Sequence, residues 1–179
     1  MIYYFDNRYI LIGLFFLFIV LAGYVKIIRK KNNRYLFYFS IMYLYICAVV
    51  KVTQFPIYAS ESMKAVIGGQ NVWKEMNWIP FKTILEGLSV DIFLNIIMTI
   101  PLGIGLPFLV RCSWKKVIIA GVIVGVLCET GQLLSALWVG FTFRHVNIDD
   151  VILNLTGTLL GYTLYKVFCY IFRQRYLVS

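Results

Sequence analysis

The chain has 179 residues, of which 61% are apolar and only 14% are charged. A soluble domain averages about 25% charged residues, so this composition excludes a soluble fold with a polar coat and predicts a membrane protein. The net charge of +9 would suit nucleic acid if it formed one patch. Because the bases are divided among short connections, we expect no nucleic-acid partner.

Five apolar runs are long enough to cross a bilayer, which takes about 20 helical residues for about 30 Å of hydrocarbon. The runs are Tyr9–Ile28, Tyr35–Thr53, Ile92–Val110, Val117–Trp138 and Val151–Phe172. We therefore expect an all-α integral membrane protein, a five-helix transmembrane bundle. The first run is too long for a signal peptide and its basic cluster follows it, so we expect an uncleaved span.

Charge predicts the orientation of the spans. The connections at residues 26–34 and 111–116 carry bases and no acid, and the tail at residues 173–179 carries Arg173 and Arg175. Basic loops stay in the cytoplasm. We therefore expect the N-terminus outside and the C-terminus inside.

The connection at residues 54–90 is the longest and is expected outside. Gly68-Gly69 indicates a turn, and aromatic residues suited to the headgroup level follow: Trp73, Trp78 and Phe81. Thr83 and Glu86 have the spacing of a capping box. We expect a short interfacial helix in this outer loop, although a soluble loop with incidental aromatic residues is the alternative.

In the third span, Asp91, Asn95 and Thr99 recur every four residues, which places them on one helical face. Pro101 lacks an N–H group, so it predicts a kink. The stripe indicates a polar site at the outer end of the span. The alternative for Asn95 is a hydrogen bond to a neighbouring helix.

The fourth span contains an acid. Gly125, Glu129 and Gln132 follow i, i+4, i+7 spacing, so Glu129 is expected to face the protein interior. A charge at a helix centre costs about 2.5–3.5 kcal/mol on insertion scales. We favour a functional role for this acid, with a structural bond to a partner helix as the alternative.

The fifth span begins with acids. Asp150, Asn154, Gly157 and Gly161 form one stripe, polar at its outer end and small below. The two glycines predict close helix packing. We expect the fourth span to be the partner, through Gly121 or Gly125.

The connection before the fifth span is polar. Asn147 or Asp149 would suit the cap of that helix, and a functional role for Asp149 is the alternative. Arg144 could pair with an acid or grip a phosphate or carboxylate of a ligand. His145 is the only histidine, and beside two aspartates it makes a poor metal site.

The sequence predicts neither a metal nor a cofactor. No Ser–His–acid spacing, phosphate-binding glycine loop or CxxC motif is present. The four cysteines have no ligand spacing, so we expect them to be small apolar packing residues.

Several of these pieces resemble the VanZ family of small bacterial membrane proteins. The motifs are Asn77-Trp78-Ile79-Pro80-Phe81, Asn95 through Gly103, Glu129-Thr130-Gly131-Gln132, Arg144 through Asp150, and Val151 through Gly157 with Gly161-Tyr162 beyond. The resemblance covers about residues 76–162. It implies a multi-pass protein of the bacterial cytoplasmic membrane, associated with teicoplanin resistance. We accordingly divide the chain into residues 1–75, with two spans and the start of the outer loop, a VanZ-like region at 76–172, and a cytoplasmic tail at 173–179.

We expect the polar side chains to converge on one outward-facing cavity. The expected ligand-binding residues are Glu129, Gln132, Arg144, Asp149, Asp150, Asn154, Asn95 and Asn77. The expected partner is an amphiphile: a lipid, a lipid-linked envelope precursor or the acyl part of a lipoglycopeptide. Two alternatives stay open. One is an enzyme on a lipid-linked substrate with Glu129 and Asp150 as acid and base and Arg144 as charge stabiliser; the other is a structural or chaperone-like partner. The sequence does not give the oligomeric state.

Overall fold

The computed structural model describes residues 2–67, 70–87 and 89–176. Long helices dominate it, and five of them are long and apolar enough to cross a membrane, which confirms the all-α membrane fold. The expected turn at Gly68-Gly69 and the end of the expected tail, residues 177–179, lie outside the described residues. The last helix runs on to Tyr176, so the expected tail begins as helix.

The candidate spans agree closely with the predicted ones. They are Arg8–Ile28, Asn33–Gln54, Val90–Leu109, Trp114–Val139 and Ile148–Phe172. The first span consists of α1 (Arg8–Gly23) and a π-helical end, η1 (Tyr24–Ile28); the others belong to α2 (Asn33–Gln54), α5 (Val90–Leu109), α6 (Trp114–Val139) and α7 (Ile148–Tyr176). The chain folds as two compact units, which are Met1–Trp78 with Cys128–Asn147 and Ile79–Leu127 with Ile148–Ser179. We call them unit 1 and unit 2; the second half of α6 belongs to unit 1 and the first half to unit 2.

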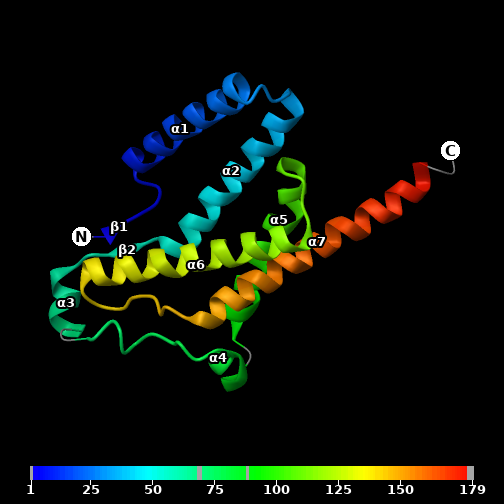
Figure 1. Cartoon of the computed structure of the whole chain (residues 1–179). Helices are drawn as coiled ribbons and strands as arrows, with labels where there is room; N and C mark the ends of the chain where they lie inside the picture. The colour runs from blue at the N-terminus through cyan, green and yellow to red at the C-terminus, as the bar shows by residue number, and fades with distance from the viewer. Residues whose placement is uncertain (1, 68–69, 88, 177–179) are drawn as a thin grey trace. The chain divides into compact units, whose positions relative to one another are not determined.

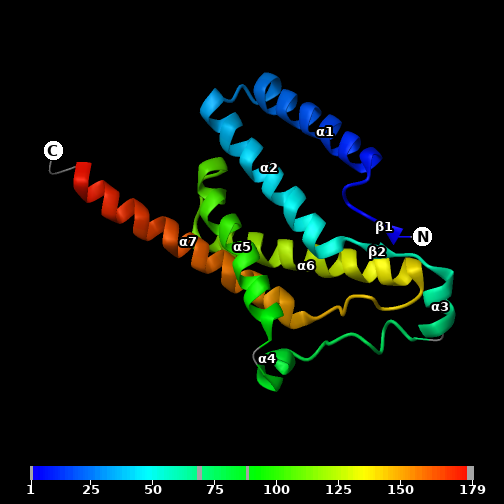
Figure 2. The ribbon, with the colours of Figure 1, turned by 180° about the vertical axis from the view of Figure 1, so that it is seen from behind.

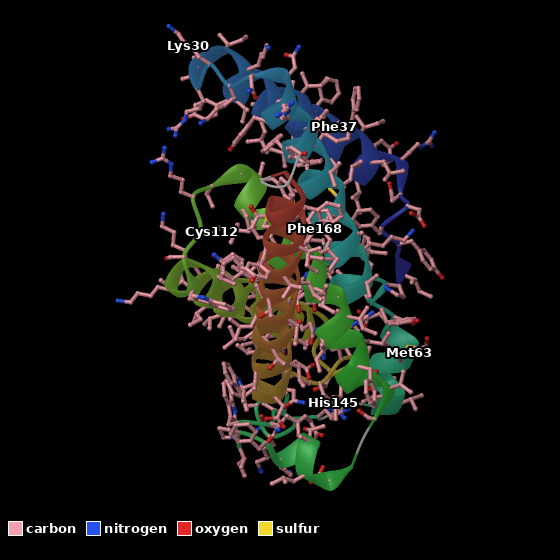
Figure 3. All side chains as sticks on the ribbon, turned by 90° about the vertical axis from the view of Figure 1, so that its right-hand side faces the viewer. Lys30, Phe37, Met63, Cys112, His145 and Phe168 are labelled. Carbon is pink, nitrogen blue, oxygen red and sulfur yellow. The ribbon has the colours of Figure 1, made fainter. Side chains whose placement is uncertain are left out.

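In unit 1, α1 and α2 lie side by side as a hairpin (Figures 1 and 2). Each begins at an asparagine whose side chain accepts a hydrogen bond from the helix: Asn7 from the Tyr9 N–H and Asn32 from the Tyr35 N–H. The Tyr43 hydroxyl donates to the Leu14 carbonyl at 2.6 Å, which joins the two helices inside the span. Lys30 lies at the hairpin turn, whereas Met63 and His145 lie at the opposite end of unit 1 (Figure 3).

The end of unit 1 opposite the turn also holds structure that the sequence did not predict. Strand β1 (Ile2–Tyr3) pairs antiparallel with β2 (Ile57–Tyr58). Asp6, three residues after β1, forms a salt bridge of 2.9 Å with Lys51. A short helix, α3 (Glu61–Ile67), follows. The strand pair ties the segment before α1 to the segment after α2, and the salt bridge ties it to the last turns of α2 itself.

In unit 2, α5 and α7 approach each other closely along three glycines. A β-carbon on Gly157 would overlap the Ile96 carbonyl, one on Gly161 the Ile100 carbonyl, and one on Gly103 the Thr158 carbonyl. The crossing of α5 and α7 is visible in Figures 1 and 2. The main chains of the two helices are therefore in direct contact, as small residues at helix interfaces allow.

The predicted partner of Gly157 and Gly161 was wrong: it is α5 and not the fourth span. The fourth span, α6, meets a different side of α7, because Gly121 lies against Leu155 and Thr158, and Gly125 against Val151. The spacing of glycines identifies a helix face made of small residues, but it does not identify the helix that packs against that face. Since α7 has two faces in close contact, it is the centre of unit 2.

The short helix expected in the connection at residues 54–90 is present as α4 (Lys82–Glu86). The capping box was wrong, however, because the N-cap residue is Phe81 and its side chain makes no capping bond. Phe81 has a φ of 66°, an uncommon conformation for a bulky residue that needs support from its surroundings.

We predict that Gly157→Ala lowers the melting temperature in detergent. The added methyl group must push main chain from main chain, and overpacking of this kind costs about 1–3 kcal/mol. Gly13→Ala is the matched control, since a β-carbon there has nothing within 4 Å and both changes gain the same helix propensity. Equal melting temperatures for the two variants would contradict the direct contact of α5 and α7.

Candidate functional site

Polar side chains are buried in both units. The fully or nearly fully buried ones are Thr53, Thr99, Glu129, Gln132, Asn147, Asp149, Asn154 and Thr158. Glu129 is only 7% exposed, so it faces the protein interior and not lipid. In hydrocarbon a polar group without a partner costs several kcal/mol, so the partners of these side chains indicate their roles.

In unit 1, two predicted site residues support the end of α2. The last carbonyls of a helix lack partners within it and carry partial negative charge. Gln132 Nε2 donates to the Thr53 carbonyl at 3.4 Å, and Arg144 Nη2 donates to the Phe55 carbonyl at 2.8 Å. The partner of the guanidinium in unit 1 is therefore a main-chain carbonyl, and its expected pairing with an acid stays a prediction.

The sequence analysis missed Gln54, the last residue of α2. Its Nε2 donates to the Cys128 carbonyl and to the Thr53 hydroxyl, each at 3.1 Å. Gly131 gives it room, because a β-carbon there would meet the Gln54 amide. A glutamine that closes an apolar run opposite a glycine was the available signal. It fixes α2 against α6.

Glu129 supports a loop. Its Oε2 accepts a hydrogen bond of 2.8 Å from the main-chain N–H of Asn147, the residue before α7. Asn147 is held from a second direction, because Asn77 Nδ2 donates to its side-chain oxygen at 2.8 Å and the Asn77 N–H donates to the Val146 carbonyl at 3.0 Å. Within unit 1, Glu129 and Asn77 thus fix the approach to the fifth span.

In unit 2, Asp149 supplies the cap that α4 lacks. Its carboxylate accepts hydrogen bonds from the main-chain N–H groups of Phe81 and Thr83, the latter at 2.8 Å. Asp149 is fully buried and sits in the first turn of α7, where negative charge is favourable. A single carboxylate therefore serves the start of two helices and supports the left-handed conformation of Phe81.

Asp150 has different partners. Its carboxylate is hydrogen-bonded to the Asn95 side chain and has the carboxylates of Asp91 and Asp149 as electrostatic neighbours. Asn95 and Asp91 belong to the polar stripe of α5, and Thr99 continues it by donating to the Asn95 carbonyl at 3.1 Å. The stripes predicted on α5 and α7 therefore meet at one end of unit 2.

Asn154 is one turn further along α7. It is 1% exposed, and its side-chain oxygen is buried without a hydrogen-bond partner. Buried polar atoms are nearly always paired, so an open acceptor beside Asp150 on the same helical face is unusual. It is an open position at which a bound group can add a hydrogen bond.

The predicted residues divide between the two units. Those of unit 1 are Asn77, Glu129, Gln132 and Arg144, and those of unit 2 are Asn95, Asp149, Asp150 and Asn154. The structure brings each set together within its own unit, and convergence of all of them on one cavity stays a prediction. Among the described residues, no group of His, Cys, Asp and Glu has the geometry to hold a metal ion. A shallow apolar depression on α3 is lined by Ser62, Met63, Val66 and Ile67, and none of the predicted residues lines it.

A profile of the VanZ/LLP1 family matches residues 40–170, more than half of the chain. The chain belongs to the VanZ/LLP1 family. No curated protein and no solved structure matches it. The family match includes every predicted site residue and confirms the resemblance seen in the motifs. It begins within α2, well before residue 76, so the polar end of α2 with Gln54 is also part of the VanZ/LLP1 region.

We predict that Asp149→Asn detaches α4 in this VanZ/LLP1 protein. The change removes the charge and turns one acceptor into an NH₂ group that faces a main-chain N–H, at a cost of about 1.5–3 kcal/mol. Hydrogen exchange at the Phe81 and Thr83 amides should become faster. Glu86→Gln, an exposed acid on α4 itself, is the matched control, and unchanged exchange in Asp149→Asn would contradict the cap.

A second pair of variants tests the role of Glu129. Glu129→Gln keeps an acceptor for the Asn147 N–H, whereas Glu129→Leu leaves that buried donor without a partner, which costs about 1–3 kcal/mol. Leu should therefore lower the melting temperature in detergent more than Gln does. Equal stability of the wild type and both variants would show that the loop does not depend on this carboxylate.

Proposed function

We propose that this VanZ/LLP1 protein binds the head of an amphiphile at the polar ends of α5 and α7. The observation that carries the proposal is the unpartnered Asn154 oxygen, 1% exposed, one helical turn from Asp150, which is hydrogen-bonded to Asn95. A ligand that supplied a hydrogen-bond donor there would relieve an unfavourable buried acceptor. The ligand class is a membrane lipid, a lipid-linked envelope precursor or the acyl-bearing part of a lipoglycopeptide.

The surroundings of these residues favour an amphiphile. Apolar side chains on the same end of α5 are exposed, among them Val90, Phe93, Leu94 and Ile97. In a span such side chains face lipid tails. A molecule with a polar head and apolar chains matches a helix that has a polar seam on one side and exposed apolar side chains on the other.

The residues of unit 1 have a supporting part in this proposal. Gln132, Arg144 and Glu129 bond to main-chain groups at the end of α2 and before α7. The enzyme alternative needs Glu129 and Asp150 as an acid–base pair, and Glu129 has a main-chain donor as a partner. The contacts therefore favour binding over catalysis as the function to test.

We further propose that the site faces outward from the bacterial cytoplasmic membrane. Bases without acids occupy the connection between α1 and α2, at residues 29–32, and the one between α5 and α6, at residues 110–113. Basic connections stay in the cytoplasm, which leaves the first turns of α5 and α7 outside. An outward site is where a glycopeptide acts on the envelope, and we propose a role in teicoplanin-type resistance.

The test is resistance in a susceptible bacterium that expresses the wild type or Asp150→Asn. The wild type should raise the inhibitory concentration of teicoplanin, and Asp150→Asn should lose most of the increase, because a charge-assisted hydrogen bond is worth about 1.5–3 kcal/mol. Immunoblots of membranes establish equal abundance. Asp6→Asn, the same chemical change at an exposed acid of unit 1, is the control and should retain full resistance. Full resistance in Asp150→Asn would contradict the proposed site.

A further inference from the structure

We infer that the head recognised at the ends of α5 and α7 is a primary ammonium, presented by a lipid of the surrounding membrane. The inference rests on the proposed binding function and names the chemical class of its ligand. It follows from three features of the ends of α5 and α7: the negative charge of their carboxylates, the buried Asn154 oxygen without a partner, and the depth of that oxygen along α7.

The charge at this end of unit 2 is negative. Asp91, Asp149 and Asp150 are electrostatic neighbours. Asp149 accepts hydrogen bonds from two main-chain N–H groups, and Asp150 is hydrogen-bonded to the Asn95 side chain. Like charges in a medium of low dielectric constant repel strongly. A head that is anionic overall, such as a phosphate ester without a compensating amine, is therefore disfavoured here.

The base of α4 does not change this sign. Lys82 opens α4, and its side chain is exposed. The other bases of this unit before α7, Arg111, Lys115 and Lys116, follow the far end of α5. A positive ligand group is thus the partner that the carboxylates of α5 and α7 favour.

The open Asn154 oxygen adds a second requirement, a hydrogen-bond donor. A primary ammonium has a positive charge and three N–H donors, which suits two carboxylates and an amide oxygen. A quaternary ammonium has the charge without donors, and it is usually held by aromatic rings. A polyol has donors without the charge. The ammonium is the headgroup that meets both requirements.

The depth of the site favours a lipid over a soluble amine. Asp150 lies in the first turn of α7, and Asn154 lies about 6 Å deeper at 1.5 Å per residue. Asn154 is fully buried, and the same end of α5 carries exposed apolar side chains on the side of the helix that faces away from Asn95. Acyl chains along that surface would hold an ammonium at this depth, whereas a free amine lacks such an anchor.

The inference is tested in nanodiscs that contain equal parts of phosphatidylethanolamine, phosphatidylcholine and phosphatidylglycerol with identical acyl chains. Native mass spectrometry measures which lipids stay on the released protein. We expect the ethanolamine lipid to be enriched about tenfold over each of the others, as one charge-assisted hydrogen bond of about 1.4 kcal/mol or more predicts. Asp150→Asn and Asn154→Leu should abolish the enrichment, and Asp6→Asn should keep it.

A measurement on the wild type alone guards against variants that fail to fold. Free ethanolamine at millimolar concentration should leave the lipid enrichment unchanged. If it displaced the lipid, the ligand would be the free amine and the inference of a lipid ligand would be wrong.

Equal retention of the three lipids, or preference for phosphatidylglycerol, would contradict recognition of an ammonium head. If Asp150→Asn then lowered the retention of all three lipids, the proposed binding site would still stand. If Asp150→Asn changed no retention, the binding site itself would fail.

Discussion

The structure depends on one constraint, which is that a helix in a membrane can end only where its terminal main-chain groups find partners. Water supplies those partners in a soluble protein, but hydrocarbon does not. Here polar side chains from other segments supply them. Gln132 and Arg144 donate to carbonyls at the end of α2, and Asp149 accepts from the N–H groups that begin α4.

This constraint explains why charged and amide residues occur inside or beside apolar runs. Arg144 places positive charge near the C-terminal end of α2, and Asp149 places negative charge near the start of α4 and of α7. Both match the direction of the helix dipole. The cost of burying each group is offset by the main-chain partners that it satisfies, so burial of a charge does not by itself indicate chemistry.

The sequence predicted the spans well because length and apolarity alone decide them. It also predicted which faces of α6 and α7 are polar or small, since helical spacing places residues on faces. It could not predict the partner of a face. Two faces of α7 are in close contact with other helices, and Gly157 and Gly161 lie on the face that contacts α5. The spacing of the glycines would be the same whichever helix packed against them.

The site was predicted in the same uneven way. The sequence singled out the buried polar residues because polar groups are rare in the runs, but it did not predict their hydrogen bonds. The capping box at Thr83 failed because the acceptor for its N–H came from Asp149, 66 residues away in the chain. Local motifs do not contain such distant partners. Gln54 was missed because an amide at the end of a run reads as an ordinary boundary residue.

The distinction between supporting and binding residues therefore has to come from the hydrogen bonds. Glu129 and Asp149 both accept from main-chain N–H groups, and both are needed for the local fold. Asp150 is hydrogen-bonded to a side chain of another helix, and Asn154, one turn further along α7, has a buried oxygen without a partner. This open acceptor, and not the burial of acids as such, is the observation that supports the proposed binding of an amphiphile.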